Sequence, residues 1–582
     1  MTRSRSLGFL SAFSLSVALL ATPCAAQFED LAFPLQVRSR TVERIELELP
    51  DGALADLAEF DSVRLLGVPL PGGQVDVELE RIAIDTRRFE FALDGAPLSD
   101  PLAGLELSVW SGHVRSAPAD EVMLAFSIVG CRGWIRRGAE LFHLACGASA
   151  TGGWDAPLMV LTSEATLRRI GAQPPPLCRA RELTPQSSSG AATPSTPASG
   201  APGSASSSAS LAPTLLEARV AIETDYQLLQ VFGGNVAAQV SYLTSLLTWI
   251  SYRYEEQIQT VLTYPYVGLY STPADPWSTP DSVGSTVDML FEFQGAWTGA
   301  LPAGAHLGAF ISGAPLGGGV AWLPGLCNAP FNFSVSANIS AGVSFPVSVN
   351  SGNWDFMVVA HELGHNFSAP HTHDYCPTPT DDCAPPGLSG ACQSTQTCTN
   401  TGSIMSYCHL CPGGMANFTT YFHPLSVADM RAWASNACLP LYCGSPSTYC
   451  TAKVNSQGCS PSIDYSGHPT LSGLDNFVVS ASAMINNKNG LFFFGFAPAA
   501  APFQGGTFCV QTPTIRTGLQ NSGGTPGADN CSGTYSFAFT HAYAASRNLT
   551  AGTTCYMQCW QRDPASPIPT GLTNALQFAL CN

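Results

Sequence analysis

The chain has 582 residues, of which only 12% are charged, and its formal net charge is −17. Lysine occurs only at Lys453 and Lys488, so the sequence offers neither a basic stripe for nucleic acid nor a polybasic membrane anchor. A chain of this length exceeds what one hydrophobic core organises, and we expect about three or four domains and no nucleic-acid partner.

The first 26 residues have the pattern of a signal peptide. Arg3 and Arg5 precede an apolar stretch over residues 7–21, and small residues then offer a cleavage site near Ala26. A lipoprotein signal ending at Cys24 is the alternative, although the residue before it fits poorly. No other stretch approaches about 18 continuous apolar residues, so we expect no integral membrane segment. The sequence thus predicts a secreted, extracellular protein and leaves its oligomeric state open.

Residues 27–183 alternate apolar and polar side chains in short runs, as at residues 45–49 and 75–79. This period of two predicts half-buried strands, and hence a β-rich N-terminal domain. Residues 184–213 consist mainly of Ser, Ala, Thr, Pro and Gly without an aromatic or a charged residue. Such a composition is typical of a flexible linker that proteases can reach.

Residues 214–441 show a mixed pattern of strands and helices. These predicted elements lie over residues 215–222, 235–257, 261–269, 285–297, 305–321 and 354–367. The last of them is a helix with dense apolar residues on the face that would enter a core.

Residues 442–582 are rich in Gly, Ser, Pro and Asn and contain eight cysteines. Apolar runs such as residues 491–494, with turn residues at short spacing, predict an all-β, sandwich-like module stapled by disulfides. We find no catalytic or metal-binding motif in this module. The fold class expected for the whole chain is multidomain α+β.

The chain has 20 cysteines, of which 16 follow residue 300. If Cys24 leaves with the signal peptide, 19 remain (20 − 1), so at least one thiol has no partner. Cys131 and Cys146 are close enough in sequence to pair, whereas Cys178 stands alone. This distribution is typical of a disulfide-rich secreted protein with one functional cysteine, and it leaves the connectivity open.

One motif carries the chemistry, and it reads His-Glu-Leu-Gly-His-Asn-Phe-Ser-Ala-Pro-His over residues 361–371. On a helix, His361 and His365 lie on one face, one turn apart, where two imidazoles can bind one metal ion. His371 can supply a third nitrogen if the helix ends and the chain turns back. Three neutral histidines with an open fourth position are typical of a catalytic zinc ion, and Glu362 lies where its carboxylate can serve as the catalytic base.

The same pattern followed by a Met-turn is characteristic of the metzincins. Met405 follows His371 by 34 residues (405 − 371) and would form an apolar floor beneath the metal; an ordinary core methionine is the alternative. His373 could replace His371 as third ligand, although the spacing favours His371. We expect His409 and His423 to be structural or surface residues.

Residues 213–440 resemble the reprolysin/adamalysin-like branch of the metzincins, of the bacterial secreted type. The run Ala-Ile-Glu-Thr-Asp-Tyr at 221–226 is similar to the opening strand of that family. The residues Gly318, Gly319, Val320 and Ala321 resemble the substrate-binding edge strand of the family. Leu326 and Cys327, which come next, resemble the region of a structural cysteine in that family. The resemblance implies a mixed five-stranded sheet, one catalytic Zn²⁺, a possible Ca²⁺ without assigned ligands, and hydrolysis of peptide bonds in protein or peptide substrates.

Two residues depart from the family pattern. Ser368 stands where the family has Gly, at a turn that often needs φ > 0, and a non-Gly residue there costs on the order of 1 kcal/mol. Thr372 stands where adamalysins tend to have Asp directly after the third histidine, and Asp374 comes later. The turn at Ser368 therefore decides whether His371 reaches the metal.

Cys178 resembles the cysteine switch of such zymogens, because Pro-Pro-Pro-Leu-Cys-Arg at 174–179 lies just before the linker. A thiolate in the fourth position of the zinc would exclude the catalytic water until the linker is cut, and a thiol without a function is the alternative. The segment 27–183 would then be a propeptide.

The sequence thus predicts a secreted zinc-dependent endopeptidase that is made as a latent zymogen. One alternative is an adhesion or matrix-binding protein whose C-terminal β module dominates and whose protease domain is a scaffold. Another is a zinc hydrolase of non-protein substrates, which the extended-strand site argues against.

Overall fold

The computed structural model describes residues 28–85, 88–149, 153–171, 183–184, 215–302, 304–340, 353–444, 446–472 and 475–581. The predicted signal peptide, Cys178 and nearly all of the predicted linker lie outside these residues. The described chain is mixed α+β and rich in strands. None of its described helices combines the length and the apolar character that crossing a membrane requires.

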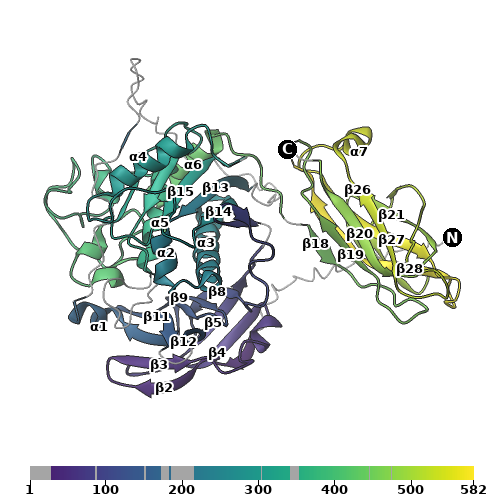
Figure 1. Ribbon diagram of the computed structural model, residues 1–582, viewed down its shortest axis with the longest axis horizontal. Helices are drawn as coiled ribbons and strands as arrows, with labels where there is room; N and C mark the ends of the chain where they lie inside the picture. Colours follow the sequence, from purple (N-terminus) through teal and green to yellow (C-terminus); the bar gives the residue numbers. More distant parts are fainter. Residues whose placement is uncertain are drawn as a thin grey trace, which may run out of the picture.

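The N-terminal segment forms a ten-stranded sheet, purple to blue in Figure 1. In spatial order the strands are β1 (Glu29–Ala32), β4 (Ser62–Leu70), β5 (Gly73–Ile82), β8 (Ser108–Val114), β9 (Ala117–Phe126), β10 (Arg132–Arg137), β11 (Glu140–Ser149), β12 (Gly153–Ser163), β3 (Arg44–Glu48) and β2 (Gln36–Arg40). A 3-10 turn, η1 (Asp56–Ala58), and helix α1 (Glu164–Arg169) complete the segment. The alternation in the sequence matches the buried face: Ile45 and Leu47 are fully buried, whereas Arg44 and Glu48 are exposed and Glu46 is half-buried.

A second sheet has seven strands. In spatial order they are β16 (Gly319–Ala321), β17 (Phe333–Ser336), β15 (Leu307–Ile311), β13 (Leu216–Thr224), β14 (Thr260–Leu269), β6 (Phe89–Leu93) and β7 (Ala96–Pro97). Five of these strands come from the segment 214–441, and β16 runs antiparallel to β17 at one edge. The other two come from the N-terminal segment, and β6 pairs in parallel with β14. The five-stranded sheet implied by the resemblance is thus extended, because β6 covers an edge of β14 that would otherwise be open.

Helices α3 (Val236–Ile258), α4 (Thr286–Trp297) and α5 (Trp354–Asn366) pack on this second sheet, and α2 (Tyr226–Val231) and α6 (Pro424–Asn436) contact α3. The same part of the chain contains the 3-10 turns η3 (Thr372–Asp374), η4 (Cys408–Leu410) and η5 (Gly414–Asn417). Helix α3 begins at Asn235, whose side chain accepts a hydrogen bond from the Ala238 amide, as an N-cap does. It lies between the ten-stranded sheet and α5 (Figure 1) and is buried along most of its length.

One hydrophobic core runs through both segments. It includes Trp110 and Trp134 from the N-terminal sheet together with Trp249 and Trp354 from helices α3 and α5. The predicted linker therefore separates two segments of the sequence that share one hydrophobic core.

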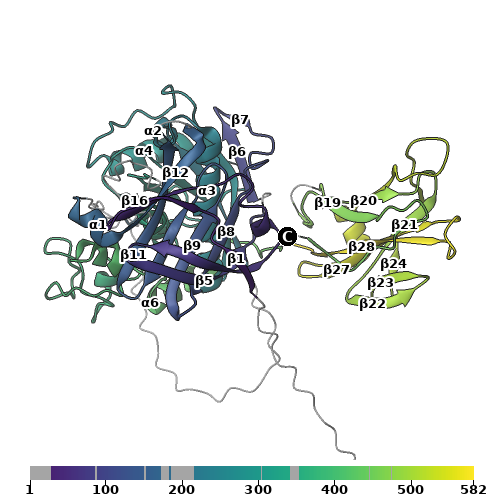
Figure 2. The same ribbon diagram turned by 90° about the horizontal axis from the view of Figure 1, so that it is seen from below.

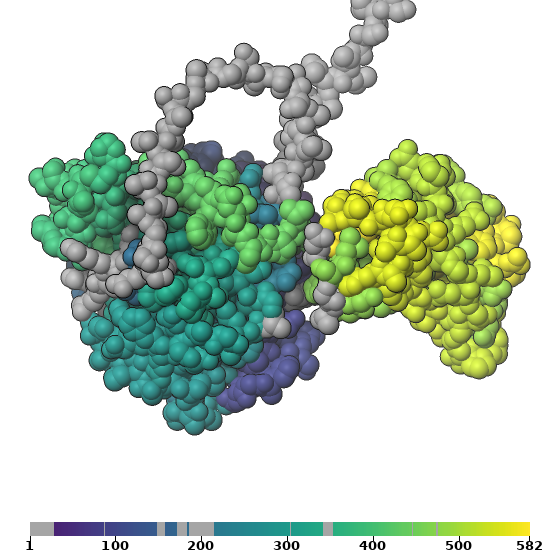
Figure 3. All heavy atoms as spheres, turned by 90° about the horizontal axis from the view of Figure 1, so that it is seen from above, coloured from purple at the N-terminus to yellow at the C-terminus, as the bar shows by residue number. Residues whose placement is uncertain are grey.

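The C-terminal segment forms a module with a core of its own, drawn in light green to yellow beside the rest of the chain in Figures 1, 2 and 3. Its larger sheet contains β18 (Ser447–Tyr449), β28 (Thr570–Ala579), β27 (Thr554–Arg562), β21 (Asn489–Gly495) and β24 (Ile515–Arg516), with β25 (Gln520–Asn521) also paired to β21. The other elements are β19 (Ser462–Ser466), β20 (Val478–Met484) and β26 (Gly533–Ala538) in a second sheet, the hairpin of β22 (Pro498–Phe503) and β23 (Gly506–Val510), and α7 (His541–Ser546). Both sheets contribute to one core, as Val479 and Phe494 show.

Seven disulfides are present among the described residues. They are Cys327–Cys438, Cys376–Cys392, Cys383–Cys408, Cys398–Cys411, Cys443–Cys581, Cys450–Cys509 and Cys459–Cys531. Cys131 and Cys146, whose proximity in sequence suggested a pair, are separate buried thiols, as are Cys555 and Cys559. Burial raises the pKa of the Cys131 thiol to about 12, which keeps it protonated.

Candidate metal centre

Helix α5 carries the first two histidines of the motif. The Tyr254 hydroxyl on α3 donates to the Ala360 carbonyl at 3.0 Å. At the end of α5, the Asn366 side chain donates to the carbonyl of Trp322, just after β16, at 3.0 Å and to that of Phe333 in β17 at 3.1 Å. A helix held on both sides points His361 and His365 in one direction, and their ring centroids are 4.7 Å apart.

Ser368 makes the turn that returns the chain toward these histidines. Its φ of +79° lies in the left-handed region. The Ser368 amide donates to the His365 carbonyl at 2.8 Å and the Ala369 amide to the Gly364 carbonyl at 3.0 Å, which is the Schellman arrangement at a helix end. A serine thus adopts the conformation expected of a glycine. The turn brings the His371 ring to within 4.5 Å of the His365 ring, centroid to centroid.

His361, His365 and His371 form one potential ligand set, in which one ligand atom of each lies within 4.8 Å of the others. The Nδ1 atoms of His361 and His365 lie 2.7 and 2.8 Å from backbone carbonyls, and that of His371 lies 3.2 Å from the Asp374 carboxylate. Such partners hold the proton on Nδ1 and leave Nε2 as the lone-pair donor. Within the described part of the chain, nothing hydrogen-bonds to the buried Nε2 of His361. This donor set fits a metal cation.

The electrostatics of the three rings agree with that fit. Burial lowers the pKa of His365 to about 4. Burial, and then the neighbouring imidazoles, hold the pKa values of His361 and His371 well below the usual histidine value. All three rings are therefore neutral near pH 7, which is the form that ligates a metal.

Glu362 lies beside these rings and against the edge strand β16. It is fully buried. The backbone of Gly319 comes so close that a Cβ on this residue would lie 2.5 Å from both Cδ and Cγ of Glu362. Gly318 precedes the strand with a φ of +108°, and Val320 and Ala321 complete it. Gly319, one of the residues predicted from the edge-strand pattern, thus borders the carboxylate predicted as the base.

Comparison with known families assigns this arrangement. Residues 216–419 match the Reprolysin_5 family, described as metallo-peptidase family M12. These residues form a reprolysin-like metallopeptidase domain. The predicted resemblance to a reprolysin-like metzincin is confirmed for these residues. Among solved structures, the chain is similar to metalloproteinase-II from Bacteroides fragilis, with 12% identity and a TM-score of 0.34 over 65% of this chain and 94% of that one. No curated protein matches the chain.

Met405 of the metallopeptidase domain packs beneath the histidines. It is fully buried, and its Sδ would lie 2.6 Å from a Cβ placed on Gly364, the residue before His365. The Met405 carbonyl accepts a hydrogen bond from the Thr372 amide at 3.1 Å. Thr372, one of the two departures from the family pattern, therefore ties the turn after His371 to the methionine loop.

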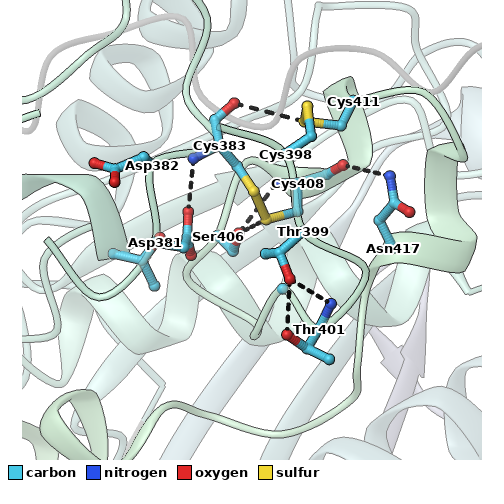
Figure 4. Close-up of a disulfide and its surroundings, with 12 residues drawn as sticks. Asp381, Asp382, Cys383, Cys398, Thr399, Thr401, Ser406, Cys408, Cys411 and Asn417 are labelled. Atoms are coloured by element: carbon cyan, nitrogen blue, oxygen red, sulfur yellow. Dashed lines mark hydrogen bonds between the residues drawn. A yellow bond between two sulfur atoms is a disulfide. The ribbon is translucent and has the colours of Figure 1, made fainter. Parts of the chain in front are cut away.

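Disulfides hold the loop that follows Met405. Figure 4 shows Cys383–Cys408 with Cys398 and Cys411 beside it. The Asn417 side chain donates to the Cys408 carbonyl at 3.1 Å. The metallopeptidase domain therefore fixes this loop covalently, independently of the metal.

Tyr407 is a residue at this site that the sequence analysis did not select. Its side chain is 2% exposed, and its hydroxyl lies 3.3 Å from the Nε2 of His371. Its position two residues after Met405 was the available signal, but a tyrosine there is equally consistent with a core residue. At this place the hydroxyl lies next to the three-histidine set.

The remaining predicted histidines of the metallopeptidase domain lie outside the ligand set. His373 groups with His371 and Asp374 instead, stacking on the His371 ring at 5.0 Å between centroids. His409 is buried, and His423 accepts a hydrogen bond from a backbone amide at the start of α6.

Proposed function

We propose that this protein is a secreted, zinc-dependent endopeptidase that cleaves peptide bonds of extracellular proteins. The observation that carries the proposal is the buried set of three neutral histidines with Glu362 beside it, in a domain of a metallopeptidase family. Three imidazole nitrogens with room for a further ligand suit catalytic zinc. These intact residues do not favour the alternative of a protease fold kept as a scaffold.

The residues divide the chemistry among them. Zinc bound by the Nε2 atoms of the three histidines would supply Lewis-acid polarisation of the scissile carbonyl. Glu362 accepts a proton from the attacking water and delivers it to the leaving amine. Its contact with the Gly319 backbone holds the carboxylate in place. The Tyr407 hydroxyl donates to the oxyanion of the tetrahedral intermediate.

The edge strand β16 supports a peptide as substrate. Among the described strands it pairs with β17 alone, so its second edge offers backbone donors and acceptors to an extended chain. Backbone pairing of this kind does not require a chain terminus, which favours an endopeptidase.

Latency through Cys178 is a further part of the proposal. Leu183 bridges Trp322 in parallel, and the Leu323 amide donates to the Leu183 carbonyl at 2.9 Å, at the end of β16. Cys178 precedes Leu183 by five residues (183 − 178), a span of at most about 17 Å of chain. Leu183, the first described residue after Cys178, therefore lies next to the substrate edge.

The activity test uses protein cut in the linker. Casein cleavage should be lost with a zinc chelator, return on addition of zinc, and be absent in Glu362→Ala with its zinc content unchanged. Glu59→Ala, at an exposed glutamate of the N-terminal segment, is the matched control and should cleave as the parent does. If the cut parent holds full zinc and cleaves no protein, the proposal fails.

Latency and export have separate tests. Cys178→Ala should cleave casein without a cut in the linker. If this variant is as inactive as the uncut parent, Cys178 is not a cysteine switch. The exported protein should begin at Gln27, as N-terminal sequencing would show. The seven disulfides support export, because they form in oxidising compartments.

A further inference from the structure

The N-terminal domain, residues 28–171, packs directly on the helix that carries the metal ligands. Trp134 on β10 is 2% exposed, and its ring lies 5.1 Å from Trp249 on α3 and 5.5 Å from Phe356 on α5, centroid to centroid. The Trp249 indole donates to the carbonyl of Trp110 on β8 at 3.4 Å. Phe356 lies five residues before His361 on the same helix (361 − 356), so removal of the domain would uncover the apolar side of α5.

A buried ion pair joins the two parts. Arg253 on α3 has a side-chain exposure of 2%, and its guanidinium lies 2.7 Å from the carboxylate of Glu121 on β9. The Thr420 hydroxyl donates to the same carboxylate at 2.5 Å. If the N-terminal domain separated from the metallopeptidase domain, the buried guanidinium of Arg253 would lose the carboxylate of Glu121. Desolvated charge pairs of this kind slow dissociation, because each charge is costly without its partner.

A second buried cation lies near the start of α5. Arg132 is 4% exposed, and its guanidinium lies over the ring of Tyr242 on α3 at 5.0 Å. The Tyr242 hydroxyl in turn donates to Asp355, in the first turn of α5, at 2.6 Å. Through Tyr242, Arg132 of the N-terminal domain is thus linked to Asp355 in the first turn of the helix that carries the histidines.

The loop after Met405 depends on the same domain for its backbone hydrogen bonds. The Arg136 guanidinium donates to the carbonyls of Ala416 and Phe418. The Met415 amide donates to the Glu164 carboxylate at 3.0 Å. Without these partners, buried backbone groups of the loop would lose their hydrogen bonds.

Strand β6 adds a fifth connection, because this strand of the N-terminal domain pairs with β14 in the second sheet. The Asp94 carboxylate, just after β6, accepts hydrogen bonds from the amide and the hydroxyl of Ser271, at 2.9 and 2.5 Å. The hydrogen bond from the Ser271 hydroxyl is the largest cause that lowers the pKa of Asp94. Two sheets, a shared aromatic core and buried charges are features of an obligate interface, not of a segment that detaches.

We infer that the N-terminal domain is a permanent subunit of the peptidase, which stays bound to the metallopeptidase domain after the linker 184–213 is cut. The mature enzyme is therefore a two-chain complex in which the N-terminal domain holds α5 and the loop after Met405. The inference rests on the proposed function only in taking a linker cut as the activating event.

The test uses the full chain with Glu362→Ala, which prevents self-cleavage, and with a specific protease site inserted into the linker. After complete cutting, both fragments should elute together in size-exclusion chromatography at about 1 µM, at the volume of the uncut protein, and also in high salt. The zinc content and the melting temperature should match those of the uncut chain. Two separate peaks, or a metallopeptidase fragment that retains zinc and melts unchanged after the N-terminal fragment has been removed, would overturn the inference.

A pair of neighbouring arginines provides the matched variants. Arg136→Ala removes the donor to the loop carbonyls, whereas Arg137→Ala changes an exposed neighbour on the same strand. In the cut protein we expect Arg136→Ala to raise the dissociation constant of the two fragments about tenfold or more, and Arg137→Ala to leave it unchanged. Equal dissociation constants would contradict the interface. This assay needs no peptidase activity, so its result stays valid even if the protein fails to cleave casein. Conversely, fragments that separate would contradict this inference but not the assignment of the metallopeptidase domain.

Discussion

Gly319→Ala should displace the catalytic carboxylate while leaving the metal ligands in place. The added Cβ would lie 2.5 Å from both Cδ and Cγ of Glu362, so the carboxylate must move by about 1 Å to reach ordinary contact. The φ of Gly319 is not among the positive values, so alanine strains no backbone angle there. A shift of about 1 Å in a catalytic group costs on the order of 10²-fold in rate. Overpacking should also lower the unfolding free energy by about 1–3 kcal/mol.

The assay compares kcat/KM on a fluorogenic peptide, zinc content and melting temperature. Gly295→Ala is the matched control, because Gly295 lies inside α4 and a Cβ there meets nothing within 4 Å. We expect this control to keep the parent's activity and to gain about 0.5–1 kcal/mol of stability. Gly319→Ala with full zinc and the parent's kcat/KM would refute the argument, since the carboxylate would then tolerate the crowding. Loss of zinc would refute it as well, by showing that the damage reaches the ligands.

Three further predictions follow from other residues. Tyr407→Phe should lower kcat by about 10- to 100-fold with KM and zinc content unchanged, and an unaltered kcat would remove the hydroxyl from the mechanism. Ser368→Val places a β-branched residue at a φ of +79° and should lower the unfolding free energy in urea by roughly 1–2 kcal/mol, whereas Ser368→Gly should lose none. Burial raises the pKa of Glu223 from 4.5 to about 7, so its protonated form stabilises the fold fully below pH 4.5 and this stabilisation is lost as the pH rises through about 7. Relative to Glu223→Gln, the parent's unfolding free energy should fall by about 3 kcal/mol between pH 4.5 and about pH 8, and a flat difference would show that burial is not the cause.

The local chemistry of the site could be read from the sequence because spacing along a helix determines direction. Four residues separate His361 from His365, and this interval alone places both rings on one face. The left-handed turn at position 368 was implied by the family resemblance, and Ser368 adopts that conformation. The helix predicted over 354–367 and the observed α5, Trp354–Asn366, differ by one residue.

Non-local partners could not be read in the same way. The alternation in the N-terminal segment predicts which face of a strand is buried, but it does not say that Trp134 meets Phe356 or that β6 joins β14. Tyr407 shows the same limit at the site itself, because its residue type suits a core as well as a catalytic hydroxyl. The proximity of Cys131 and Cys146 in sequence suggested a disulfide, whereas the chain keeps both as buried thiols.

The bridge between Leu183 and Trp322 gives the cut enzyme a built-in competitor for its own substrate edge. A cut in the linker leaves Leu183 joined to an N-terminal domain that stays bound, so its effective concentration at the end of β16 is on the order of millimolar. A dilute substrate would rarely displace it. A second cut between residues 171 and 183 would free this edge while the N-terminal domain remains in place.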